Sequence, residues 1–131
     1  LSRFENPEML HTVKDIMTTD VAALKVDDTI QIAIERMVKD GISQLPVLSE
    51  DGGIVGIVSE GSILQKGAQR NGVVGQVMDT NPFIVDIGLS VAEARRRLTE
   101  VEALLIVEDD YLVGLVSKMD LVRALRLNSI A

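Results

Sequence analysis

Ser117, Lys118 and Asp120 are the residues of this sequence whose types and spacing are best suited to chemistry. A carboxylate such as that of Asp120 can accept hydrogen bonds from both neighbouring hydroxyls of a ribose, and charge-assisted bonds of this kind are strong. Ser117 at a helix start adds a hydroxyl group, and the free backbone N–H groups there favour a phosphate or another anion. Lys118 adds a positive charge beside it. The run Ser117-Lys118-Met119-Asp120 therefore predicts a candidate binding site.

The same spacing also has a purely structural interpretation. Ser-x-x-Asp is a capping box, in which the two side chains satisfy backbone groups at the start of a helix. Ser117 and Asp120 would then stabilise the last helix without binding anything. Both interpretations can hold at once.

A related run, Ser59-Glu60-Gly61-Ser62, lies earlier in the chain and has a serine where the later run has Asp120. A serine cannot hold two neighbouring hydroxyls with a charge, and Glu60 would repel a nearby phosphate. We therefore expect two unequal sites. The one at Asp120 is predicted to be the better, and the second, at Ser59 and Ser62, to be weak, empty or tuned to another ligand.

These two runs belong to an internal repeat that covers most of the chain. Three stretches recur in order: 13–17 as 74–78, 29–37 as 90–98, and 56–59 as 114–117. The offset is 61 residues at Met17 and Met78 (78 − 17) but 58 at Gly56 and Gly114 (114 − 56), so the second copy lacks three residues. A repeated unit too short to bury its own apolar face usually packs against its twin, and a ligand can bind where the twins meet.

The first copy predicts a strand at 21–26, a helix, a hairpin and a short helix. Thr29 suits a helix N-cap and Gly41 a helix end. Between them runs an apolar stripe with helical spacing: Ile30, Ala33, Ile34, Met37 and Val38. Strands are predicted at 45–48 and 54–58, joined by a turn at 50–53 whose residues tolerate positive φ. Ser59 would cap a helix that ends near Leu64.

The second copy repeats this order. We expect a strand at 83–85, a capping box at Ser90 and Glu93, and a hairpin of 104–107 with 112–116, followed by a last helix over 118–127. Its helical stripe consists of Val91, Ala94, Leu98 and Val101. Each copy is thus β-α-β-β-α, which makes the predicted fold class α/β. The predicted divisions are an arm or linker at 1–12, a first copy at 13–65, a linker at 66–72, a second copy at 73–127 and a tail at 128–131.

Composition excludes several classes of function. The 131 residues contain no cysteine, which excludes disulfides and thiolate chemistry. A net charge of −7 and an aromatic content of 2% argue against a nucleic-acid surface. No run is long and apolar enough for a membrane helix, and we expect a cytoplasmic protein that does not act at a membrane. We see no catalytic motif and no metal-ligand spacing, and therefore expect neither an enzyme nor a metal site.

The repeated order resembles a tandem pair of CBS domains, a Bateman module. The residues that carry the resemblance are Leu45-Pro46-Val47 at the entry to the first hairpin and the run 114–120 after the second. It covers residues 13 to about 127. The resemblance implies two CBS motifs related by a pseudo-twofold axis, whose clefts bind adenine nucleotides or S-adenosylmethionine as regulatory ligands. It also implies a homodimer of paired modules and an attached effector domain under its control.

The resemblance further implies the surroundings of the site. In the family, the ribose carboxylate of one motif faces the first strand and the helix-to-strand junction of the other. Carried over, Asp120 would hold the ribose, and the wall of its cleft would consist of Asp20, Val21, Ala22, Ile42 and Ser43. Because we see no strong basic cluster for a triphosphate, AMP or an adenosine with an uncharged tail fits better than ATP.

Two functions therefore compete. The first is a regulatory module that senses an adenosyl ligand: AMP, ADP, ATP or S-adenosylmethionine. The second is a structural dimerisation module without a ligand, in which Ser-x-x-Asp only caps a helix. Because the chain begins at Leu1 rather than Met, we expect it to be a piece of a longer protein.

Overall fold

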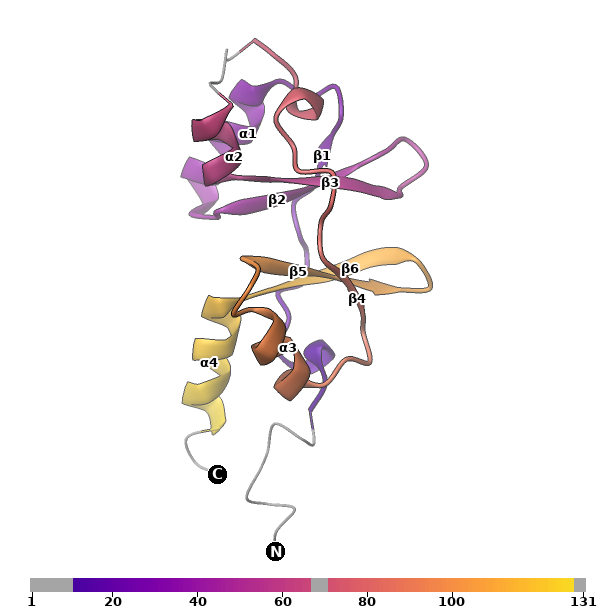
Figure 1. Ribbon diagram of the computed structural model, residues 1–131, viewed down its shortest axis with the longest axis vertical. Helices are drawn as coiled ribbons and strands as arrows, with labels where there is room; N and C mark the ends of the chain where they lie inside the picture. Colours follow the sequence, from indigo (N-terminus) through magenta and orange to yellow (C-terminus); the bar gives the residue numbers. More distant parts are fainter. Residues whose placement is uncertain (1–10, 67–70, 129–131) are drawn as a thin grey trace, which may run out of the picture. The chain divides into compact units, whose positions relative to one another are not determined.

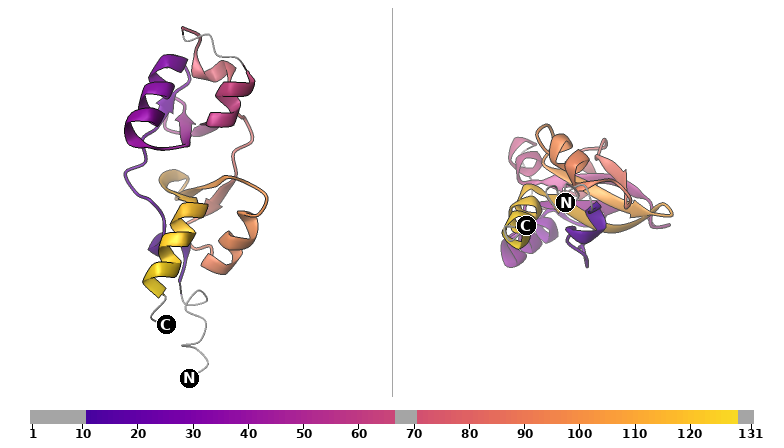
Figure 2. Two further views of the ribbon diagram at one scale, coloured as in Figure 1. Left: turned by 90° about the vertical axis from the view of Figure 1, so that its left-hand side faces the viewer. Right: turned by 90° about the horizontal axis from the view of Figure 1, so that it is seen from below.

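The computed structural model describes residues 11–66 and 71–128 and divides the chain into two compact units (Figure 1). Unit 1 consists of residues 1–21 and 83–131, and unit 2 of residues 22–82. The units do not follow the order of the repeat. The start of the first sequence copy, up to residue 21, belongs to unit 1, and the start of the second copy, residues 73–82, belongs to unit 2. The chain therefore passes from one unit to the other twice (Figure 2).

Unit 2 is a three-stranded sheet with two helices. Along the chain it contains β1 (Leu24–Lys25), α1 (Ile30–Asp40), β2 (Gln44–Leu48), β3 (Ile54–Ser59), α2 (Glu60–Gln65) and the 3₁₀ turn η4 (Val74–Gln76). β1 is parallel to β2, and β2 is antiparallel to β3. In Figure 1, α1 and α2 lie at one end of the β2–β3 hairpin, opposite its turn.

Unit 1 repeats this plan. It begins with the 3₁₀ turn η3 (Val13–Asp15) and continues with β4 (Ile84–Asp86), α3 (Val91–Arg97), β5 (Ala103–Glu108), β6 (Tyr111–Ser117) and α4 (Lys118–Asn128). β4 is parallel to β5, and β5 is antiparallel to β6. The predicted α/β class, with two β-α-β-β-α copies, is confirmed.

The ends of α1 follow the predicted signals. The Thr29 hydroxyl accepts a hydrogen bond from the Ile32 N–H at 3.2 Å, and Gly41 ends the helix in the left-handed region at φ 64°. Ile30, Ala33 and Met37 are buried as expected. Val38, the last residue of the predicted apolar stripe, is 78% exposed and is not part of the buried face of the helix. It lies one position past Met37, where the helical rotation turns it away from the sheet.

Three further boundaries differ from the prediction. β1 contains only Leu24–Lys25, because just these two residues pair with β2. α3 ends at Arg97, so Val101 lies outside the helix. Of the capping box predicted at Ser90 and Glu93, the Ser90 hydroxyl accepts from the Glu93 N–H at 3.1 Å, while the Glu93 carboxylate pairs with arginines.

The start of each sequence copy packs against the hairpin of the other copy, with a methionine (Met17 or Met78) close to a glycine (Gly114 or Gly56). The Thr18 N–H and C=O bond to Leu115 at 2.9 and 3.0 Å, and Asp79 bonds in the same way to Ile57 at 2.8 and 2.9 Å. A Cβ on Gly56 would lie 2.6 Å from Met78 Sδ and 2.8 Å from the Asp79 carbonyl oxygen. Only glycine allows such close approach of two backbones.

Each unit has its own apolar core. The core of unit 2 includes Leu45, Val58 and, from the segment after the linker, Val74. The core of unit 1 includes Leu104, Val116 and, from the N-terminal segment, Val13. Among the described helices none has the length and apolarity needed to cross a membrane.

Candidate functional site

Asp120 is the one polar residue that the described part of the chain buries fully, with 4% of its surface exposed. It lies in the first turn of α4, directly after β6, so the strand and the helix fix its position together. Its Oδ2 accepts hydrogen bonds from the Ser117 backbone N–H at 2.7 Å and from the Ser117 hydroxyl at 3.0 Å. One half of the predicted capping box, the bond from the Ser117 N–H to the Asp120 carboxylate, is therefore present.

The other oxygen, Oδ1, is held by two side chains. The Thr18 hydroxyl donates to it at 2.8 Å from the N-terminal segment of unit 1, and Arg123 Nη1 donates at 3.1 Å from the next turn of α4. Four donors thus occupy about four acceptor positions of the carboxylate. A ligand hydroxyl must displace one of these donors, and Thr18 and Arg123 are exposed side chains that can turn to water.

The other residues of the predicted site fall into two groups. Lys118 and Met119 stand beside Asp120 at the start of α4, and both are exposed. Asp20 and Val21 also belong to unit 1, and Asp20 has a left-handed φ of 55°.

Ala22, Ile42 and Ser43 belong to unit 2, where Ala22 and Ile42 pack against its core and the Ser43 carbonyl accepts from the Glu60 N–H at 3.1 Å. That these residues form one wall with Asp20 and Val21 around a ligand stays a prediction.

The corresponding run of unit 2 forms a complete capping box. The Ser59 N–H donates to the Ser62 hydroxyl at 2.9 Å, and the Ser62 N–H donates to the Ser59 hydroxyl at 3.0 Å. The Ser62 hydroxyl donates in turn to the Ser59 carbonyl at 2.9 Å. Two neutral hydroxyls thus do here what the Asp120 carboxylate does in unit 1.

Beside this capping box lies an open pocket of about 490 Å³. All of its lining residues belong to unit 2, and they include Ser59, Ser62, Lys66, Met78, Asp79 and Thr80. Small-molecule pockets commonly have about 300–1,000 Å³. The site predicted to be the weaker one therefore has a pocket large enough for a small ligand.

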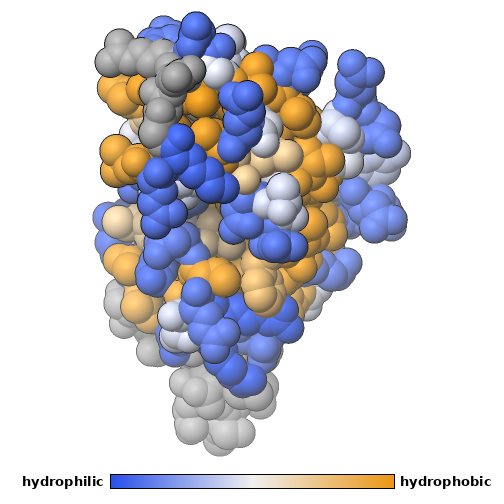
Figure 3. All heavy atoms as spheres, turned by 45° about the horizontal axis from the view of Figure 1, so that its top comes forward, coloured by the Kyte–Doolittle hydropathy of each residue, from blue (hydrophilic) through white to orange (hydrophobic). Residues whose placement is uncertain are grey.

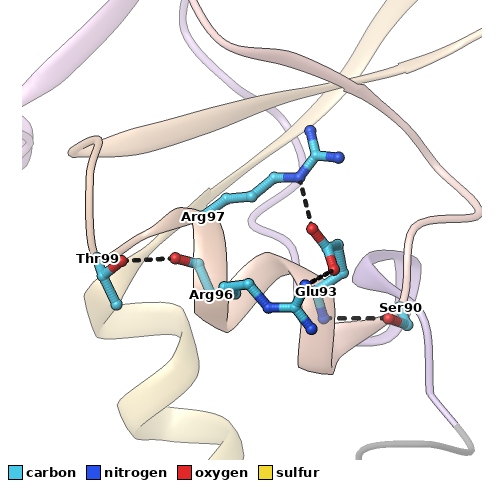
Figure 4. Close-up of polar contacts among 5 residues, drawn as sticks. All are labelled: Ser90, Glu93, Arg96, Arg97 and Thr99. Atoms are coloured by element: carbon cyan, nitrogen blue, oxygen red, sulfur yellow. Dashed lines mark hydrogen bonds and ion pairs between the residues drawn. The ribbon is translucent and has the colours of Figure 1, made fainter.

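Two arginines on α3, Arg96 and Arg97, share one acidic partner. Figure 4 shows Arg96 and Arg97 turned toward Glu93, whose two oxygens they reach at 3.0 and 3.2 Å. The Arg97 guanidinium also lies 5.3 Å from the centre of the Phe83 ring, within the range of a cation–π contact. Glu93 therefore offsets one of the three positive charges of α3.

Sequence reasoning missed Thr18, Asp79 and Arg123. Aligning the repeat at its methionines places Thr18 opposite Asp79, one residue after each methionine. That alignment could have shown a hydroxyl and a carboxylate at equivalent positions. Arg123 lies three residues after Asp120, a spacing at which helical side chains meet.

Comparison with known proteins gives one family. The family model described as CBS domain matches residues 13–68 and 74–127. The CBS domain-containing protein YhcV of Bacillus subtilis is 33% identical over 118 residues, which are 86% of this chain and 84% of that protein. Homoserine O-acetyltransferase of Methanosphaerula palustris is 31% identical over 111 residues, but these are 82% of this chain and 23% of that enzyme.

The fold is shared with solved structures. The structure of CBSX2 in complex with AMP superimposes with a TM-score of 0.82 and 26% sequence identity, covering 91% of this chain and 98% of that one. CBSX2 comes from Arabidopsis thaliana. The chain spans about a quarter to a third of the length of several of the curated relatives that it matches.

Proposed function

Because this chain belongs to the CBS domain family and carries two CBS domains in tandem, we propose that it is a regulatory module that binds an adenosyl ligand. Asp120 is the group that holds the ribose. The observation that carries this proposal is the Asp120 carboxylate, buried yet bound on Oδ1 by exposed side chains. AMP bound to the related CBSX2 supports the same ligand class.

Binding replaces bonds that the carboxylate already makes. Ser117 holds Oδ2 through a backbone N–H, which fixes the orientation of the carboxylate before a ligand arrives. The Thr18 hydroxyl on Oδ1 has the same chemistry as a sugar hydroxyl. One ribose hydroxyl takes the place of the Thr18 hydroxyl on Oδ1, and a second ribose hydroxyl takes the place of Arg123. Because water solvates the two released side chains, the exchange leaves no buried group without a partner.

The ligand regulates by linkage. A ligand shifts an equilibrium only as far as its affinities for the two states differ, typically by about 1–3 kcal/mol. The displaced Thr18 lies on the N-terminal segment of unit 1, and its backbone is bonded to β6. Ligand binding at Asp120 therefore acts on the segment that connects toward unit 2, and an attached effector domain reads the change.

Isothermal titration calorimetry with AMP, ADP, ATP and S-adenosylmethionine tests this function. We expect AMP or S-adenosylmethionine to bind more tightly than ATP, because the two cations beside the carboxylate, Lys118 and Arg123, do not balance the charge of a triphosphate. Asp120→Asn keeps the shape of the side chain but removes its charge, and should weaken binding by about 1.5–3 kcal/mol. If none of the four ligands produces heat or raises the Tm, the proposed function is wrong.

A second function, structural dimerisation, is supported by the surface of α4. Met119, Val122 and Leu125 lie three residues apart on this helix and are 54%, 56% and 54% exposed. Figure 3 colours another face of the molecule, with the top of Figure 1 turned forward, and shows hydrophobic residues in orange beside hydrophilic ones in blue. We infer that α4 pairs with a second copy of the chain. Sedimentation of Val122→Glu against the unaltered chain tests this, and a loss of dimer is expected.

A further inference from the structure

Asn71 and Gly72 form an asparagine–glycine pair in the turn that precedes η4. Asn71 is exposed, and glycine has no side chain to hinder the approach of its backbone nitrogen to the asparagine side chain. Among the residues that the structure describes, neither the Asn71 side chain nor the Gly72 N–H has a hydrogen-bond partner. We propose that Asn71 is a site of spontaneous deamidation, a covalent modification of the chain that needs only water.

The reaction balances without a catalyst or an oxidant. The Gly72 nitrogen attacks Cγ of Asn71, the new N–Cγ bond closes a succinimide ring, and the Cγ–Nδ2 bond breaks. The side-chain nitrogen leaves as ammonia and takes with it the proton of the Gly72 N–H. Water then opens the ring at either carbonyl. Opening at Cγ gives aspartate, whereas opening at the main-chain carbonyl gives isoaspartate, in which the chain runs through the former side chain.

An aspartate–glycine pair can close the same ring, but the fold hinders this at Asp51. The Gly52 N–H, which would have to attack, donates to the Ser49 carbonyl at 3.0 Å. The Asp51 carboxylate accepts the Ser49 hydroxyl and the Gly53 N–H, which favours its ionised form. An ionised carboxylate is a poor target for a nucleophile. This turn therefore engages both of the groups that the Asn71 turn leaves open.

The other aspartate–glycine pair, Asp40 and Gly41, is hindered in a similar way. The Gly41 N–H donates to the Met37 carbonyl at the end of α1, so its nitrogen is part of the helix cap. Of the three pairs in the sequence that join an asparagine or an aspartate to a glycine, only that of Asn71 keeps its glycine N–H free within the described residues.

Isoaspartate at position 71 would disturb a contact at the start of α1. The Gly72 carbonyl accepts the Ile30 N–H at 2.8 Å, and the Val74 N–H donates to the Asp28 carbonyl at 2.8 Å. Ile30 is the first residue of α1, so its N–H has no partner within the helix. Isoaspartate adds one methylene to the main chain directly before Gly72. The modification therefore weakens the attachment of the second copy's start to unit 2.

The test follows the full chain over time in mildly alkaline buffer, with and without guanidinium chloride at a denaturing concentration. Mass spectrometry of separated peptides distinguishes asparagine, aspartate and isoaspartate. Because the fold leaves the reacting groups of Asn71 open, deamidation should be less than about tenfold slower in the folded chain than in denaturant. Formation of isoaspartate at Asp51 should be slowed by more than about tenfold, since it first requires local opening of the turn.

Two controls identify the reaction. Asn81 is followed by Pro82, which has no N–H, and it should stay intact in both conditions. Asn71→Gln keeps the amide but must close a larger, less favoured ring, and should lose the modification over the same period. The isoaspartate fraction of the unaltered chain should have a lower Tm than Asn71→Asp, which carries the new charge without the extra methylene.

The inference is overturned if folding protects Asn71 as strongly as it protects Asp51. It is also overturned if Asn71 stays intact in the folded chain after the denatured chain has reacted completely. An isoaspartate fraction with the same Tm as Asn71→Asp would contradict the role given to the contact between Gly72 and Ile30.

Discussion

The two units differ in their polar side chains at a place where their backbones make the same hydrogen bonds, at Thr18 in unit 1 and Asp79 in unit 2. In unit 1 the Thr18–Asp120 pair is closed: the hydroxyl donates to the carboxylate at 2.8 Å, and Asp120 is buried. In unit 2 the Asp79–Ser62 pair is open: Ser62 bonds within its own capping box, and Asp79 faces a pocket. The difference shows that a repeat can keep one scaffold while the charged group moves from one supporting segment to the other.

The largest expected effect concerns the closed pair. Asp120→Ala removes the acceptor of four hydrogen bonds, and should lower the free energy of unfolding by about 2–4 kcal/mol. Ser62→Ala removes one hydroxyl from a capping box, and should cost about 1 kcal/mol. Urea denaturation of both variants measures this. Equal losses would mean that the two helix starts depend on their polar residues to the same extent.

The next largest effect is expected at the two glycines that lie against Met78 and Met17, Gly56 and Gly114. Gly56→Ala brings a Cβ to 2.8 Å from the Asp79 carbonyl oxygen, and should destabilise the protein by about 1–3 kcal/mol. Gly114→Ala should cost less than Gly56→Ala, because its Cβ would lie 3.1 Å from the Thr18 carbonyl oxygen. Its shorter contacts, 2.4 Å to Sδ and 2.8 Å to Cγ, are with the side chain of Met17, which can move more readily than a backbone.

Gly61→Ala is the control for these two variants. The nearest atom to its Cβ would be Ser59 Oγ at 3.8 Å, and alanine favours the helix by up to about 1 kcal/mol. Thermal melting of the three variants should rank Gly61→Ala as the most stable and Gly56→Ala as the least. The opposite order for Gly56 and Gly114 would contradict the packing described for the two segments.

A swap of residues sharpens the comparison. Ser62→Asp adds a second carboxylate to the pocket that Asp79 lines, and repulsion should cost roughly 1 kcal/mol of stability. Adding Asp79→Thr recreates the pair found in unit 1 and should recover this loss. A double variant no more stable than Ser62→Asp would show that the two units are not equivalent at these positions. Urea denaturation of the single and double variants measures the recovery.

The smallest effect concerns the turn between β2 and β3. The Ser49 hydroxyl, and then the Gly53 backbone N–H, donate to the Asp51 carboxylate and hold its pKa below the usual value. Because this pKa is depressed in the folded state, its contribution to stability is present above the unfolded pKa and is lost as the pH falls through the folded pKa. Ser49→Ala should raise the pKa of Asp51, as a carbon-detected NMR titration would measure. An unchanged pKa would contradict the role of the hydroxyl.

Local signals in the sequence predicted the elements well because they act over a few residues. Thr29 and Gly41 mark both ends of α1, and the acidic pair Asp109 and Asp110 takes left-handed φ values of 52° and 68° in the predicted second turn. A turn and a cap depend on a few neighbouring residues, which the sequence displays directly.

The sequence did not predict that the start of each copy packs in the unit formed by the other copy. Val13 and Val74 are buried in cores that the other sequence copy supplies, and this depends on contacts between the two copies rather than on local pattern. For the same reason the sequence predicted only part of the hydrogen bonding around Asp120. Ser117 and Asp120 are close in sequence, whereas Thr18 reaches Asp120 only through the fold.

The most direct measurement of the central claim is the affinity for AMP of the unaltered chain and of Asp120→Asn, determined by equilibrium dialysis. If the Asp120 carboxylate holds the ribose, Asp120→Asn should bind AMP about tenfold to a hundredfold more weakly than the unaltered chain. Equal affinity of the two, or no AMP bound to the unaltered chain, would contradict the account.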